Sequence, residues 1–204
     1  ILSVFPLVWM LIAATNKSAD VTAGRLNFGT YLVQNYRNLI GQQQVWRSFV
    51  NSGKYAILTT VLSLLVCSLA GYAFEIFHDK LKDILFMVIL TTMMLPFVAL
   101  MVPLFQMFSS ANLLNSTLGF LLPSISTPVM IMMFRQSARS FPLEIVEAAR
   151  IDGLSEIGIF FRMFFPMMKS TYAAAATMTF MNAWNNYLWP KVIMTKGEAQ
   201  TMPM

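Results

Sequence analysis

Three long stretches of the chain contain no charged residue, and their lengths give the first prediction. Residues 55–74 run for 20 positions without a charge, 170–190 for 21 and 84–134 for 51. About 20 apolar residues cross the hydrocarbon core of a bilayer as a helix. The first two stretches therefore each predict one membrane span, with the last one placed at about 167–190, and the third predicts a hairpin of two spans.

A polar cluster at 109–112, followed by Asn115 and Ser116, has the composition of a turn. It divides the long stretch into spans at about 84–108 and 118–134. Four prolines inside these two spans each remove a backbone hydrogen bond, which predicts kinks. They are Pro96, Pro103, Pro123 and Pro128.

The first 14 residues are apolar but too short for a complete span. A signal-peptide core would have a basic region before it and a small-residue cleavage pattern after it, and this sequence has neither. We therefore interpret 1–14 as a span whose start precedes this chain. With it, the pattern predicts an all-α membrane protein, a polytopic helical bundle with five visible spans in a single domain, 1–204.

Counting spans assigns each connection to one of two membrane faces. Loop 15–54, turn 109–117 and tail 191–204 share one face, while loop 75–83 and segment 135–169 share the other. Each face carries seven Lys and Arg residues, so the positive-inside rule does not choose between them, although the second face is the denser one.

Composition supports a membrane protein and excludes several functions. The chain is 57% hydrophobic and 11% charged, against roughly 25% charged for soluble domains. Its net charge of +5 is spread over both faces without a basic cluster, which argues against nucleic-acid binding. One Cys and one His form neither a disulfide nor a metal site, and the phosphate-binding pattern GxxxxGK[ST] is missing. We therefore expect no cofactor in this chain.

The most specific local pattern lies in segment 140–166, between two apolar runs. Pro142 is predicted in the first turn of a short helix, with Glu144 near the positive end of the helix dipole and Gly153 ending the helix. Glu147 is followed by Ala148 and Ala149. A carboxylate beside two small side chains allows a partner surface to approach the backbone closely.

The spacing of this segment, EAA with Gly six residues after the Glu and Pro166 thirteen after the Gly, resembles the EAA loop of permease subunits in binding-protein-dependent ABC importers. Asp152-Gly153 and the run at 182–189 (NAWNNYLW) most resemble the carbohydrate branch, which includes the maltose-type and glycerol-phosphate-type permeases. The resemblance covers essentially all 204 residues. The chain departs from the usual pattern at Met163, Phe165 and Ser170.

The resemblance implies a transport subunit that is not itself an enzyme and that carries a sugar, oligosaccharide or sugar phosphate. It implies a cytoplasmic ATP-binding subunit, holding ATP and Mg, as the partner of 140–166. A second homologous permease and an extracytoplasmic solute-binding protein would complete the complex in the bacterial or archaeal cytoplasmic membrane. A sixth span is expected beyond residue 204. The residues implied in coupling are Glu147, Ala148, Ala149, Asp152 and Gly153.

Three asparagines near the end of the last stretch are candidate solute contacts. Asn182, Asn185 and Asn186 follow i, i+3, i+4 spacing and are predicted on one helix face. Their amides, with the ring of Tyr187, suit hydrogen bonding to sugar hydroxyls and stacking. Alternatively, the asparagines join helices and the aromatic residues form an interfacial belt, an interpretation that we favour for Trp189.

Other functions remain open at this point. Within the family, a permease for a peptide, amino acid or polyamine is the main alternative. An ion channel or a membrane enzyme would need ionisable residues inside the spans, and the charge-free stretches contain none.

Overall fold

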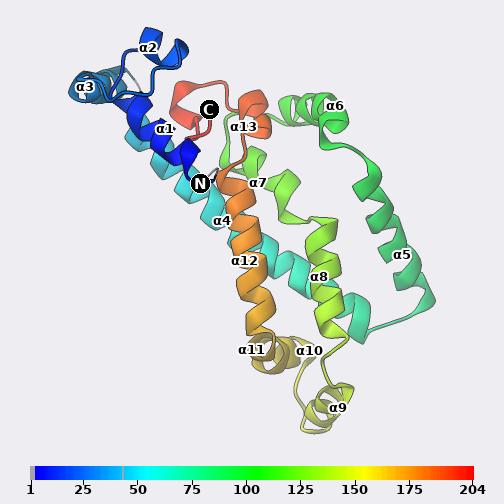
Figure 1. Ribbon diagram of the computed structural model, residues 1–204. Helices are drawn as coiled ribbons and strands as arrows, with labels where there is room; N and C mark the ends of the chain where they lie inside the picture. Colours follow the sequence, from blue (N-terminus) through cyan, green and yellow to red (C-terminus); the bar gives the residue numbers. More distant parts are fainter. Residues whose placement is uncertain (1–2, 43) are drawn as a thin grey trace. The chain divides into compact units, whose positions relative to one another are not determined.

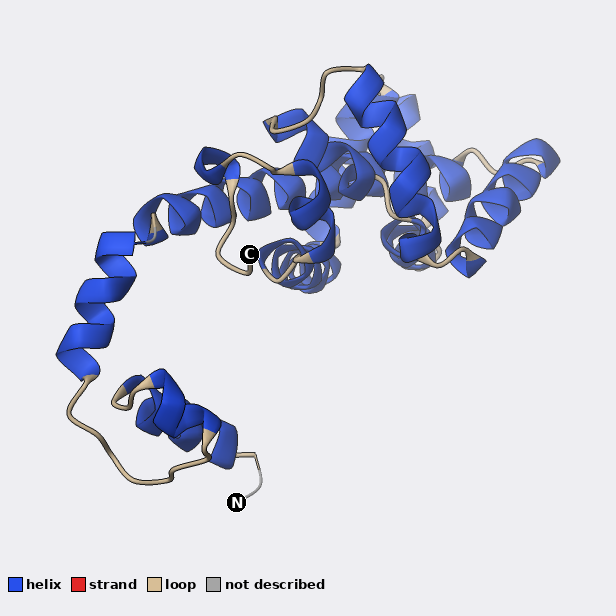
Figure 2. Cartoon of the chain, turned by 90° about the horizontal axis from the view of Figure 1, so that it is seen from above, coloured by secondary structure: helices blue, strands red, loops and turns tan. Residues whose placement is uncertain are grey.

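A computed structural model describes residues 3–42 and 44–204, and all regular structure within these ranges is helical (Figure 2). The predicted all-α class is thus confirmed. The chain forms two compact units, Ile1–Ser48 and Phe49–Met204. Whether they act as one permease domain over 1–204 stays a prediction.

The first unit contains α1 (Phe5–Ala14), α2 (Ser18–Thr22) and α3 (Leu32–Gln42). Ile1 and Leu2 of the predicted first span lie outside the described residues. Asn16, buried after α1, donates from Nδ2 to the carbonyls of Ile12 and Asn27 at 2.9 and 2.7 Å. The predicted loop 15–54 therefore contains two helices of its own and also the beginning of α4.

Most of α4 (Val45–Ile76) belongs to the second unit, where it crosses α8 and α12 at an angle (Figure 1). The next elements are α5 (Lys80–Thr91), η1 (Thr92–Met94), α6 (Phe97–Ser110), α7 (Thr117–Ile125) and α8 (Pro128–Ala138). They are followed by α9 (Leu143–Ile151), α10 (Glu156–Ile159), the π-helical turn η2 (Phe160–Phe164) and α11 (Phe165–Met167). The last are α12 (Lys169–Trp184), α13 (Leu188–Ile193) and η3 (Gly197–Ala199).

Two of the four prolines coincide with sharp breaks. The chain bends by 103° between η1 and α6 at Pro96, and by 47° between α7 and α8 at Pro128. Leu95, before Pro96, is extended because the proline ring excludes the helical conformation from its predecessor. Pro103 and Pro123 lie inside helices. Among the described helices, α4 alone is long and apolar enough to cross a bilayer, and the number rises to three if each bent pair is one span.

Trp189 explains how the helix containing Pro123 tolerates it. Pro123 lacks the N–H that would bond the carbonyl of Gly119, and the Trp189 indole Nε1–H donates to that carbonyl instead, at 3.0 Å. The Trp189 side chain is 1% exposed and packs edge-on against Phe108. The interpretation of Trp189 as a residue of an interfacial belt is therefore wrong, because its ring lies in the core.

Candidate functional site

The predicted coupling segment forms a short helix, α9, at one end of the second unit (Figure 1). Val146 and Ala149 on its buried face are 1% and 3% exposed. They join an apolar cluster that includes Tyr72 of α4, Phe160 of η2 and Met168, next to the start of α12. The inner face of α9 is therefore packed directly against α4 and against the residue that precedes α12.

The end of α9 is fixed by local hydrogen bonds around Gly153, which has a φ of +79°. The Gly153 N–H donates to the Arg150 carbonyl at 3.1 Å, and the Leu154 N–H donates to the Ala149 carbonyl at 2.9 Å. This is the Schellman arrangement, which favours glycine because a side chain strains the left-handed conformation. The predicted helix stop at Gly153 is confirmed. Pro142 differs slightly from its prediction, since it caps α9 instead of lying in its first turn.

The exposed face of α9 combines a carboxylate with apolar side chains. Glu147 and Ala148 are exposed, and Asp152 and Gly153 are exposed just after the helix. Leu143 and Ile151, one turn before and one turn after Glu147, are 55% and 87% exposed. The sequence analysis missed these two apolar residues, although their i, i+4, i+8 register with Glu147 could have identified them.

Ala149 does not share this exposed face. Its side chain points into the apolar cluster, so it is not available to a partner that contacts Glu147. The difference has a simple cause, because Ala149 lies three residues after Val146 and so on the same side of the helix. Of the two alanines, only Ala148 offers its small side chain to the outside.

A cluster of charged side chains links α4, α5 and α8 near the predicted coupling segment. The Arg135 side chain of α8 is 6% exposed, and it donates to Glu75 of α4 at 3.0 Å and to Asp83 of α5 at 2.7 Å. Its guanidinium lies 4.3 Å from the ring centroid of Phe86. The hydrogen bond from Arg135 holds the pKa of the Asp83 carboxyl below its usual value.

The backbones of α4 and α8 are in close contact at Gly71, four residues before Glu75 in the sequence. A Cβ added to Gly71 of α4 would lie 2.6 Å from the backbone nitrogen of Arg135 and from Cβ of Phe134. Real Cβ atoms do not approach so closely, so a glycine is required for α4 and α8 to touch here. Gly71 therefore has a packing role, as small residues often do where membrane helices approach closely.

The candidate solute residues gather where α12 ends. The helix stops at Trp184, so Asn182 lies in its last turn while Asn185 and Asn186 follow it. Asn185 Nδ2 donates to the Met181 carbonyl at 2.9 Å, and Asn186 Oδ1 accepts from the Trp189 N–H at 3.4 Å. The prediction that the three amides share one face of a continuous helix is therefore wrong. Two of them bind backbone groups around the helix end.

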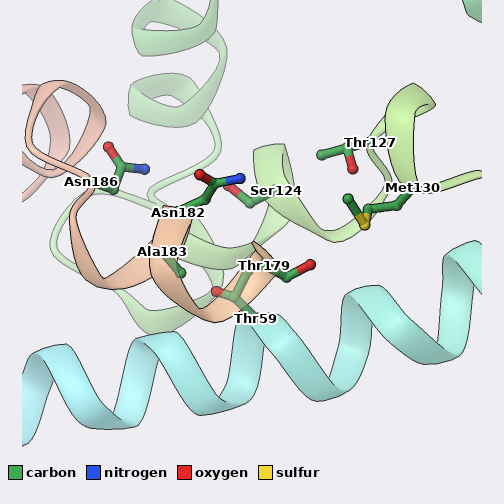
Figure 3. A pocket seen from close by; sticks show the side chains of 8 residues that line it. All are labelled: Thr59, Ser124, Thr127, Met130, Thr179, Asn182, Ala183 and Asn186. Atoms are coloured by element: carbon green, nitrogen blue, oxygen red, sulfur yellow. The ribbon is translucent and has the colours of Figure 1, made fainter. Parts of the chain in front are cut away.

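These residues nevertheless line adjoining cavities. A cavity of about 110 Å³ lies between α4, the α7–α8 break and α12 (Figure 3). Its lining consists of Thr59, Ser124, Thr127, Met130, Thr179, Asn182, Ala183 and Asn186. A more open cavity of about 460 Å³ shares four of these residues and adds Phe97, Pro123, Asn185, Tyr187 and Leu188. All four candidate solute residues thus lie on its wall.

Sequence analysis did not find the hydroxyl residues of the smaller cavity. Thr59 comes from α4, Thr179 from α12, and Ser124 and Thr127 flank the α7–α8 break. Threonine and serine are common in membrane helices, where they usually bond within their own helix. Nothing in their local sequence distinguishes a residue that faces a cavity from one that does not.

Comparison with known proteins places this architecture. The family model for the binding-protein-dependent transport system inner membrane component matches residues 67–204. The lactose transport system permease protein LacG of Rhizobium radiobacter is 45% identical over 203 residues, covering 100% of this chain and 74% of LacG. The arabinooligosaccharides transport system permease protein AraQ of Bacillus subtilis is 33% identical, covering 100% of this chain and 74% of AraQ. The sn-glycerol-3-phosphate transport system permease protein UgpE of Escherichia coli is 34% identical, covering 97% and 73%.

The fold has a solved counterpart as well. A chain in the crystal structure of a bacterial ABC transporter involved in the import of the acidic polysaccharide alginate superposes with a TM-score of 0.83. The two are 23% identical, and the match covers 99% of this chain and 71% of the other. Sequence and fold agree. The chain belongs to the family of inner-membrane components of binding-protein-dependent transport systems.

Proposed function

We propose that this chain is a permease subunit that moves a saccharide across the bacterial or archaeal cytoplasmic membrane. The relatives LacG, AraQ and UgpE are named for lactose, arabinooligosaccharides and glycerol phosphate, so polyhydroxylated solutes recur among them. The hydroxyl and amide lining of the two cavities suits such a solute.

Coupling to ATP hydrolysis is assigned to α9. Its outer face offers Glu147 for a basic partner group, Ala148 for close approach, and Leu143 and Ile151 for an apolar groove. Its inner face is embedded in the apolar cluster. A helix that is anchored on one side and exposed on the other is suited to transmit a push from a cytoplasmic ATP-binding subunit, which would hold the ATP and Mg. This two-sided construction is the observation that carries the proposal.

Two routes connect α9 with the cavities. One passes through the apolar cluster into α12, whose last turn lines the cavity at Asn182. The other passes from α8 through the Arg135 cluster into α4 and α5. Transport then requires two states of these helices, biased by ATP at the ATPase and by a loaded solute-binding protein at the outer face, with a second homologous permease opposite.

The test uses the complete importer, reconstituted in proteoliposomes with its ATPase and binding protein. Glu147→Ala is expected to leave the chain folded but to lower ATPase retention and uptake of labelled lactose about tenfold or more. One buried charge-assisted contact accounts for a loss of that size. Glu144→Ala is the matched control, since Glu144 serves the start of the same helix. Normal uptake by Glu147→Ala, or an equal loss from Glu144→Ala, would contradict the assignment of Glu147.

A further inference from the structure

Two buried hydroxyls in the smaller cavity have no hydrogen-bond partner within the described residues. They belong to Thr59, which is 1% exposed, and Thr179, which is 8% exposed. Both residues line the cavity, one from α4 and one from α12 (Figure 3). A buried hydroxyl without a partner is costly, so these two groups need a partner that enters the cavity.

Two neighbouring threonines on the same helices differ from Thr59 and Thr179, because their hydroxyls have partners. Thr60, next to Thr59 on α4, donates from Oγ1 to the Ala56 carbonyl at 2.7 Å. Thr177, two residues before Thr179 on α12, donates to the Ala173 carbonyl at 2.9 Å. Both hydroxyls are satisfied within their own helices, as is usual for threonine in a helix. Neither residue lines the cavity.

The chemistry of the walls restricts what can enter. No residue that lines either cavity carries a charge. The polar groups are hydroxyls and amides, which both donate and accept, and within the described residues the Asn182 amide makes no hydrogen bond of its own. Phe97 and Tyr187 add aromatic rings to the wider cavity. A charged solute would lose hydration here without finding a counter-charge.

Resting on the proposed function, we propose that Thr59 and Thr179 form, with Asn182, a subsite for an uncharged sugar ring in transit. Hydroxyls of the sugar satisfy both threonines, and the absence of a basic group on the walls disfavours sugar phosphates and sugar acids. UgpE is named for a phosphate ester and the alginate transporter for an acidic polysaccharide. The subsite therefore predicts that this chain differs from both in the charge of its solute.

The experiment replaces both hydroxyls by methyl groups. Thr59→Val with Thr179→Val, in the reconstituted importer, is expected to lower the uptake rate of labelled lactose and maltose about tenfold, as the loss of two ordinary hydrogen bonds implies. ATPase stimulation by the loaded binding protein and the melting temperature should be unchanged or higher, because the variant also removes two unpaired groups. Thr60→Val and Thr177→Val are the controls, with uptake expected at the wild-type level. Thr59→Ser with Thr179→Ser should restore uptake.

Each outcome decides a separate question. Wild-type uptake by the double valine variant would overturn the subsite and leave the hydroxyls in contact with water only. A fall in uptake accompanied by a clearly lower melting temperature would also overturn the subsite, because it would indicate a structural role for the two threonines. Import of sn-glycerol 3-phosphate by the wild type as fast as lactose would overturn the selection for neutral solutes. If the wild-type importer carries none of these solutes, the proposed function itself fails.

Discussion

The coupling end and the cavity end of the second unit are built in opposite ways. At α9, neighbouring residues supply the hydrogen bonds that end the helix. The buried face of α9 packs in a single apolar cluster. At the cavity, polar residues from three separate regions of sequence meet around a helix end, and two hydroxyls stay unpaired.

Under the proposed function, this difference separates a surface for a partner protein from a site for a solute in transit. The outer face of α9 is held rigid by its buried side, so a protein can dock on it repeatedly in one geometry. The cavity instead offers two hydroxyls without a hydrogen-bond partner among the described residues, which suits a solute that binds only in transit. Both descriptions can be tested by comparing substitutions at two residues of the same type whose side chains lie in different surroundings.

The largest effect is expected from the two alanines of α9. Ala149→Trp should destabilise the chain by about 3 kcal/mol, because an indole cannot fit the packed cluster. Ala148→Trp should leave stability within about 0.5 kcal/mol, since its side chain is exposed, but should block ATPase docking. Melting temperature in detergent and ATPase retention separate the two. Equal melting temperatures for both variants would show that Ala149 is not part of the core.

A smaller loss is expected at the charged cluster. Arg135→Met should cost about 2 kcal/mol, because it leaves Glu75 and Asp83 without their shared partner while both still reach water. Arg139→Met, which removes an exposed arginine 3.4 Å from Glu75, should cost less than about 1 kcal/mol. Thermal unfolding of the two variants provides the comparison, and a reversed order would refute the central role of Arg135.

This cluster also predicts a pH dependence. The pKa of Asp83 is lowered in the fold, so its pairing with Arg135 stabilises the protein above the ordinary carboxyl pKa of about 4 and is lost as the pH falls through the lowered value. Asp83→Asn should remove this part of the acid sensitivity. A difference in melting temperature between wild type and variant that stays constant between about pH 7 and about pH 2 would contradict the contribution of Asp83.

The smallest effects concern two glycines. Gly153→Ala should destabilise by about 1 kcal/mol, because an alanine is strained at a φ of +79°. Gly41→Ala should have the opposite sign, stabilising by roughly 0.5–1 kcal/mol, since Gly41 lies inside α3 with open space around its Cα. Paired denaturation curves test the signs, and stabilisation by Gly153→Ala would show that the Schellman turn does not persist in solution.

Local patterns predicted helix stops and turns well. Gly153 and the turn at 109–117 were identified from their residues, and Asn112 and Asn115 in that turn have positive φ values of 55° and 56°. The charge-free stretches located α4, α6–α8 and α12, although the break at Pro96 and the end of α12 at Trp184 divide them further. These features depend on residues that are close in sequence, so a sequence pattern can predict them.

The cavity could not be predicted in the same way. Asn182 was identified as one of three asparagines with helical spacing near the end of an apolar stretch. Thr59 and Thr179, in contrast, lie 120 positions apart and resemble any other helix threonine. Ala149 and Ala148 are likewise identical in sequence and opposite in burial. Only the packing of α4, α7, α8 and α12 decides which hydroxyl faces a cavity and which face of α9 is buried.

Cross-linking from Ile151 tests most directly whether α9 is the surface that meets the ATP-binding subunit. Ile151 is 87% exposed, whereas the native Cys67 is buried. A benzophenone attached to Ile151→Cys in the assembled importer should cross-link to the ATP-binding subunit. The same probe on Met107→Cys, 62% exposed on α6 at the other end of the unit (Figure 1), should not. An importer that transports normally, yet yields no ATPase adduct from Ile151→Cys or an equal adduct from Met107→Cys, would contradict the assignment of α9 as the docking surface.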